Sequence, residues 1–115
     1  MSGHYDLTIE QGTSFNITFT WSVDGTPVDL TGWDARAQVR SMVTSATALL
    51  DLTVGDGITL GDAAGTIALH VPVADTTALP APFEGVWDLE LTSDVNTVTR
   101  LLEGGVTVTP EVTRD

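Results

Sequence analysis

The stretch Phe15-Asn-Ile-Thr-Phe-Thr-Trp-Ser-Val23 has the clearest periodicity in the chain. Large apolar side chains occupy every second position, and the residues between them are Asn, Thr and Ser. Alternation with a period of two places the apolar side chains on one face of an extended strand. The stretch therefore predicts a strand with one face in a core and the other face in solvent.

Similar alternation returns in short segments along most of the chain. These segments are rich in Val, Leu, Ile and Thr, which favour strands, and Gly, Asp, Asn or Pro separate them. The further predicted strands cover 5–9, 35–39, 48–53, 58–60, 66–71, 83–92 and 97–109. Asp24-Gly25 predicts a tight turn, and Gly104-Gly105 predicts a β-bulge in the last strand.

The fold class follows from the number and spacing of these segments. Residues 73–80 have helical spacing and end at a proline, so we expect one short helix there. Seven or eight short strands joined by local turns are typical of an antiparallel β-sandwich, immunoglobulin-like or jelly-roll-like. We expect an all-β fold with a single domain over 1–115, and short arms at 1–6 and 110–115.

The composition limits the classes of partner. The chain has 16 acidic and 4 basic residues, a net charge of −12 and no cysteine. This charge repels phosphates, so we expect neither nucleic acid nor a membrane as a partner. The lack of cysteine excludes disulfides, thiolate metal sites and a cysteine nucleophile. No stretch is apolar over the length of a membrane helix, and the first residues predict no secretory signal.

Candidate catalytic groups are few. His4 falls in the N-terminal arm and His70 on the polar side of a strand, where solvated side chains are the expected state. Asp88 and Glu90, with Glu84 in line, match the residue types of a glycosidase carboxylate pair. Such an enzyme also needs an aromatic-lined cleft, for which a chain of this size has little room. We therefore expect no catalytic residue.

Metal and sugar sites have equally weak signals. Asp56 and Asp62 lie beside glycines, but their spacing fits neither an EF-hand loop nor a glycine-rich calcium repeat. Turn formation explains both residues, so we expect no metal and no cofactor. Trp21 and Trp87 lie on apolar strand faces, which leaves Trp33 as the candidate platform for a sugar. The sequence assigns no binding residue.

Five segments together carry a resemblance to a known family. They are EQGTSFNITFTW (10–21), DGTPVDLTGWDARAQVRS (24–41), GDAAGTIALHV (61–71), GVWDLELTS (85–93) and TRLLEGGVTVTPEVTR (99–114). The chain resembles the β-sandwich domain at the N-terminus of phage baseplate upper proteins and tail-fibre-type proteins. It is similar, too, to short stand-alone proteins of tailed bacteriophages.

The resemblance implies a role in the virion. In the larger relatives this domain anchors a receptor-binding or fibre portion to the particle. It implies a non-enzymatic structural protein of the tail or baseplate, an adaptor or fibre-attachment module that contacts other virion proteins in many symmetric copies. The contacts would use terminal arms or an exposed edge strand. No functional residue is carried over, because the matching positions are structural: Gly12, Phe15, Asp29, Leu30, Gly32, Gly65, Gly85 and Leu102.

Three alternatives stay open from the sequence. A capsid decoration protein would be equally small, acidic and β-rich, and symmetric repetition would make weak contacts sufficient there as well. A host carbohydrate-binding module would use Trp33 and nearby acids. A glycosidase-like fragment that uses Glu90 is a more distant alternative.

Overall fold

The computed structural model describes residues 3–42, 44–45 and 47–111. The strands are β1 (Gly3–His4), β2 (Leu7–Glu10), β3 (Phe15–Thr20), β4 (Ser22–Val23), β5 (Thr26–Pro27), β6 (Asp34–Arg40), β7 (Leu50–Val54), β8 (Gly57–Leu60), β9 (Thr66–Val71), β10 (Phe83–Thr92) and β11 (Val98–Thr109). The described ranges also hold the short helix α1 (Val73–Ala78) and a 3-10 turn (Asp62–Ala64). The all-β class is therefore confirmed. The sequence predicted the helix but missed the 3-10 turn.

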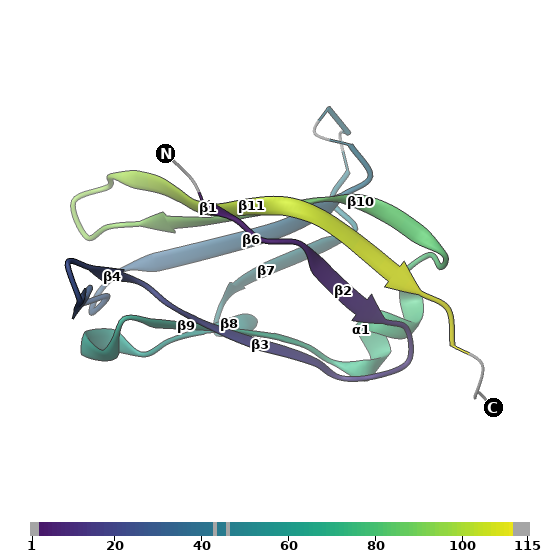
Figure 1. Cartoon of the computed structure of the whole chain (residues 1–115), viewed down its shortest axis with the longest axis horizontal. Helices are drawn as coiled ribbons and strands as arrows, with labels where there is room; N and C mark the ends of the chain where they lie inside the picture. Colours follow the sequence, from purple (N-terminus) through teal and green to yellow (C-terminus); the bar gives the residue numbers. More distant parts are fainter. Residues whose placement is uncertain (1–2, 43, 46, 112–115) are drawn as a thin grey trace.

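Nine of the strands form one curled sheet. The strand order is β1-β11-β10-β6-β7-β8-β9-β3, with β2 also paired to β11, and β4 and β5 form a separate hairpin. Figure 1 shows β6, β10 and β11 in an upper layer and β3, β8 and β9 in a lower layer. The curl thus brings the two ends of one sheet face to face.

The sheet is mixed, which differs from the expected antiparallel sandwich of seven or eight strands. Three pairings are parallel: β1 with β11, β2 with β11, and β7 with β8. The described ranges contain eleven strands, of which β1, β4 and β5 are only two residues long. A period of two identifies a strand and its buried face, but it says nothing about the direction of the neighbouring strand.

The parallel pairing of β7 with β8 arises where the chain crosses between the layers. Only Thr53 and Val54 pair with Gly57 and Ile58. Gly55 has a φ of 86° and Gly57 a φ of 102°, values that residues with a side chain rarely adopt. These glycines let the chain fold back between β7, which pairs with β6, and β8, which pairs with β9.

The last strand is continuous where a bulge was predicted. β11 runs without interruption through Gly104 and Gly105. The register shift lies elsewhere, because Leu89 pairs with Leu102 while Glu90 pairs with Arg100. The prediction of a bulge at the two glycines is therefore wrong.

The two glycines instead leave room for the N-terminal backbone, which lies alongside β11 at this point. A side chain at Gly104 would collide with the backbone carbonyl of Tyr5. The amide of Tyr5 donates to the carbonyl of Glu103 (3.0 Å), and its carbonyl accepts from Nε1 of Trp87 (2.7 Å). The amide of Gly105 donates to Oδ1 of Asp6 (2.9 Å). Residues 3–6 of the predicted arm thus lie along β11, whereas 1–2 and 112–115 fall outside the described residues.

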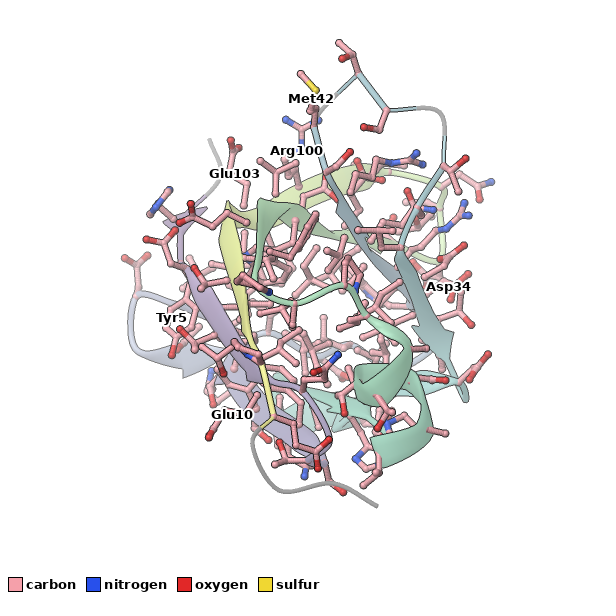
Figure 2. All side chains as sticks on the ribbon, turned by 90° about the vertical axis from the view of Figure 1, so that its right-hand side faces the viewer. Tyr5, Glu10, Asp34, Met42, Arg100 and Glu103 are labelled. Atoms are coloured by element: carbon pink, nitrogen blue, oxygen red, sulfur yellow. The ribbon has the colours of Figure 1, made fainter. Side chains whose placement is uncertain are left out.

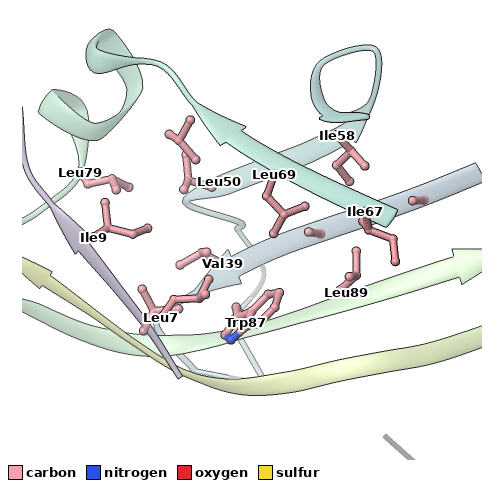
Figure 3. Close-up of a cluster of buried hydrophobic side chains, with 14 of the residues drawn as sticks. Leu7, Ile9, Val39, Leu50, Ile58, Ile67, Leu69, Leu79, Trp87 and Leu89 are labelled. Carbon is pink, nitrogen blue, oxygen red and sulfur yellow. The ribbon is translucent and has the colours of Figure 1, made fainter. Parts of the chain in front are cut away.

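Apolar side chains fill the space between the layers. Figure 2 shows labelled charged residues such as Glu10, Asp34 and Arg100 around the outside of the molecule. Figure 3 shows a large part of the core. The buried apolar residues are Leu7, Ile9, Leu30, Ala35, Ala37, Val39, Leu50, Ile58, Ile67, Leu69, Val71, Leu79, Trp87, Leu89, Leu91, Val106 and Val108. No buried side-chain nitrogen or oxygen of the described residues lacks a hydrogen-bond partner.

Two residues of the predicted apolar faces are exposed. Tyr5 is 44% exposed and Val23 is 55% exposed. The strand predicted over 15–23 ends at Thr20, and Val23 belongs to the separate β4–β5 hairpin, where Asp24 and Gly25 form the turn. The chain leaves the sheet at this hairpin, so the alternating pattern no longer faces the core.

Helix α1 and the residue after it are hydrogen-bonded to the turn between β2 and β3. The hydroxyl of Thr76, the buried polar side chain of the helix, donates to the carbonyl of Thr13 (2.8 Å) and accepts from the amide of Gly12 (3.2 Å). Nε2 of Gln11 donates to the carbonyl of Leu79 at 3.0 Å. These bonds satisfy a buried hydroxyl and hold the crossing from β2 to β3 in place.

Gly104→Ala tests the close approach of the N-terminal backbone. The added methyl group would displace Tyr5 and weaken the pairing of β1 and β2 with β11, so we expect a loss of about 2 kcal/mol in the free energy of unfolding. The measurement is urea unfolding followed by tryptophan fluorescence. Gly105→Ala is the matched control, because its methyl group would meet only ordinary contacts at 3.5 Å or more. Equal losses in the two variants would contradict this account.

Candidate functional site

Polar side chains gather on the outer face of the upper layer. Register places Gln38 beside Asp88, and Asp88 beside Glu103, while Glu90 lies between Arg36 and Arg100. With Arg40 at the end of β6, three of the four arginines lie on this face. Alternation in β6 and β10 produces the arrangement, because the residues between these positions are buried.

The arginines of this face are held by neighbours. Arg36 makes a two-pronged contact with Asp51, from Nη2 to Oδ2 (2.8 Å) and from Nε to Oδ1 (3.1 Å). Arg40 donates to Oε1 of Gln38 and to the carbonyl of Ser45, both at 2.8 Å. The guanidinium of Arg36 lowers the pKa of Asp51 by hydrogen bonding, and Asp51 in turn raises the pKa of Arg36. Both groups therefore stay ionised at neutral pH.

A shallow groove of about 570 Å³ lies on this face. It is lined by His4, Gln38, Arg40, Val86, Trp87, Asp88, Arg100, Glu103, Gly104 and Gly105. Arg100 lies 3.5 Å from Asp88 and 3.9 Å from Glu103, and Figure 2 shows Arg100 and Glu103 in the same upper region. Opposite charges pair within the groove, which is typical of a solvated sheet face.

A second depression, of about 390 Å³, collects three carboxyl groups and one imidazole. Asp51, Asp56, Asp75 and His70 contribute to its lining. Across the described ranges, no three His, Asp or Glu residues lie close enough together to hold a metal ion. The depression therefore has the residue types of a cation site without the required geometry.

The predicted histidines have simple surroundings. Nε2 of His4 lies 2.9 Å from Oδ1 of Asp6, and both side chains are exposed. Nδ1 of His70 lies 2.6 Å from Oδ1 of Asn16 across the β3–β9 pair. Both histidines lie on the surface, as the sequence predicted.

The carboxylates proposed as a glycosidase pair lie on the outer side of β10. Asp88 and Glu90 are half-buried there, and Glu84 is exposed near the start of the same strand. Asp88 forms an ion pair with Arg100, and Glu90 lies between two arginines in register. Asp88 is therefore bound to a cation of the same sheet, and Glu90 lies next to two in register.

The turn aspartates have backbone roles. Asp62 has a φ of 49°, and its carbonyl accepts from the amides of Leu30 (2.9 Å) and Gly65 (3.2 Å). The amide and carbonyl of Asp56 both bond to Thr53. Turn formation explains both residues in the structure.

The tryptophans are packed against other aromatic rings. Trp33 is half-buried and meets Trp21 edge to face, with 5.7 Å between the ring centroids and 80° between the ring planes. Trp87 is buried and stacks on Phe19 at 6.1 Å, and Tyr5 meets Phe19 edge to face at 5.2 Å. Trp33 therefore has a packing partner on one side rather than a freely exposed ring.

The arginines of the upper outer face were not predicted as a group from the sequence. Arg36 and Arg40 stand two positions on either side of Gln38, so their shared face was readable from the alternation. The contribution of Asp51 was not readable, because it depends on the pairing of β6 with β7.

Comparisons of the sequence with protein-family models and with curated proteins do not identify a relative. No family model matches the sequence, and no curated protein matches it at a significant level. In the described part of the chain, no helix is long and apolar enough to cross a membrane.

Titration of Asp6 tests the link between the N-terminal segment and β11. The hydrogen bond from the Gly105 amide, together with His4, lowers the pKa of Asp6 below its ordinary value of 3.8. Because the folded pKa is lowered, the carboxylate stabilises the fold above its unfolded pKa, and this contribution is lost as pH falls through the folded pKa. We expect NMR of the carboxyl carbon to give a midpoint below 3.8. A midpoint at or above that value would show that the bond does not persist in solution.

Proposed function

We propose that this chain is a non-enzymatic structural protein of a tailed-phage virion, an adaptor or fibre-attachment module of the tail or baseplate. The five sequence segments that resemble baseplate upper and tail-fibre-type domains support this proposal, since they extend over most of the chain. The family has a β-sandwich domain, and the two facing layers of the curled sheet and its mostly antiparallel pairings are compatible with one.

The observation that carries the proposal is that two consecutive strands of the chain, β2 and β3, each form an open edge of the sheet. β2 pairs only with β11 and β3 pairs only with β9 among the described strands, so each has one unpaired side. Backbone amides and carbonyls at an open edge bind a strand of a neighbouring chain with little dependence on sequence. Repetition in a symmetric particle would make such individually weak contacts sufficient.

The charge of the chain supports a protein partner. A net charge of −12 opposes contact with nucleic acid and with anionic lipid. The arginines that the structure describes, Arg36, Arg40 and Arg100, are bound to carboxylates or to polar groups beside them. The net charge of the chain therefore favours protein partners whose surfaces are neutral or basic.

Quantitative mass spectrometry of purified phage particles tests the proposal. The particles come from the phage or prophage that encodes the chain, and heads and tails are separated before copies are counted against the major capsid protein. We expect this chain in the tail fraction at some tens of copies or fewer, as an adaptor in a ring or fibre attachment requires.

The other distributions have distinct meanings. Hundreds of copies with the heads would contradict the tail assignment and support a capsid decoration protein. Absence from both fractions would overturn the virion proposal as a whole.

A further inference from the structure

The lower layer of the sheet contains no Asp, Glu, Lys or Arg in its strands. This holds for β3 (FNITFT), β8 (GITL) and β9 (TIALHV), in a chain with 16 acidic residues. Each strand of more than two residues outside this layer carries at least one such residue. Natural sheets commonly use charged side chains to keep their edges from pairing with other sheets. The lower layer lacks that protection.

β3 is the free edge of this uncharged layer. It pairs with β9 over six consecutive residues, Phe15↔Val71 to Thr20↔Thr66, without a register shift. Among the described strands it has no partner on its other side, and Figure 1 shows it along the lower margin of the molecule. It contains no proline and no bulge. One row of its backbone amides and carbonyls is therefore open to a further strand.

The residues of β3 are self-complementary in an antiparallel pairing. In a pair of copies centred on Ile17, Phe15 lies opposite Phe19 of the second copy, and Asn16 lies opposite Thr18 of the second copy. Apolar side chains then meet on the inner side, and uncharged polar side chains meet on the outer side. Phe15, Ile17 and Phe19 are only half-buried in the single chain, so the pairing would remove further apolar area from water.

We propose that β3 is a self-association edge, at which a second copy of this chain adds its own β3 in antiparallel orientation. The result is a two-fold symmetric dimer with a continuous sheet running β9-β3-β3-β9 across both copies. The inference goes beyond the proposed function, because a chain without a place in a virion can still pair in this way. A single strand pair is a small contact, so we expect a weak dimer.

The net charge makes the dimer dependent on salt in a characteristic direction. Two copies that each carry a charge of −12 repel one another, and salt screens that repulsion. The contact itself contains no ion pair that salt would weaken. We therefore expect dimerisation to strengthen as ionic strength rises. Binding of a basic partner to this edge would instead weaken as ionic strength rises.

Sedimentation velocity of the full chain tests the proposal, over a wide concentration range at low and at high salt. We expect a monomer–dimer equilibrium that shifts towards dimer with concentration and with salt. Thr18→Asp places a carboxylate on each side of the two-fold axis, and we expect it to weaken the dimer about tenfold or more. Thr59→Asp is the matched control, because Thr59 is exposed in the same cross-strand row (Thr18–Ala68–Thr59) but two strands from the edge. It should leave the dimer unchanged.

Two results would overturn the proposal. One is a wild-type chain that stays monomeric at the highest concentration in high salt. The other is an equal loss of dimer in both aspartate variants, which would assign the effect to total charge. Thermal unfolding of each variant establishes that the fold is retained.

Cysteine pairs test the register independently, because the chain has no cysteine of its own. Asn16→Cys with Thr18→Cys places thiols opposite one another across the proposed two-fold axis, within reach of a disulfide. Ala68→Cys with His70→Cys is the matched control, since these residues pair with Thr18 and Asn16 one strand further in. We expect oxidation to link copies of the first variant much faster than copies of the second. Equal rates would contradict the register.

Discussion

The fold depends on the parallel pairing of the N-terminal strands with the last strand. β1 and β2 lie along β11 on either side of Gly104, and the carbonyl of Tyr5 between them accepts from the indole of Trp87. A hydrogen bond of this kind contributes about 1 kcal/mol net, but leaving the buried indole N–H without a partner would cost more. The pairing also covers the core with Leu7 and Ile9, which are both buried. This pairing joins residues that are separated by almost the whole length of the sequence.

The two layers of the curled sheet differ in chemistry. The upper layer carries arginines and carboxylates that neutralise one another within the sheet, as in the contact of Arg36 with Asp51. The strands of the lower layer carry no such side chain and end in the free edge of β3. In an acidic chain, this division leaves one set of strands that adds no charge of its own to the repulsion between chains. The proposed contact role follows from that division rather than from any cluster of catalytic groups.

Much of this fold was readable from the sequence. The alternation around Ile67, Leu69 and Val71 placed those residues in the core, and the helical spacing after them gave the position of α1. The turn at Asp24-Gly25 was equally readable, because Asp and Gly are residues that favour tight turns. Both residues adopt the positive φ values that such a turn requires. These features depend on local periodicity and on turn chemistry, which a single segment contains in full.

The remaining features depend on which segments become neighbours. Gly104 and Gly105 read as a bulge because nothing local shows that the backbone of Tyr5 passes beside them. Parallel pairing of β2 with β11 was unreadable for the same reason. At the candidate surfaces, exposure of His70 was predicted, whereas the packing of Trp33 on Trp21 and the partner of Arg36 required the tertiary structure. Sequence periodicity predicts which side chains of a strand share a face. Which residues lie beside that face depends on how the strands pair in the folded protein.

Native-state hydrogen exchange, followed by NMR at the indole of Trp87 and the amides of β2, tests the central role of the N-terminal pairing most directly. If this pairing holds the fold together, these protons exchange with the same opening free energy as the amides of β10, the central strand of the upper layer. That free energy would equal the global free energy of unfolding from denaturant experiments. Rapid exchange at Trp87 and β2, while β10 stays protected, would show that the N-terminal strand detaches alone and would contradict the account.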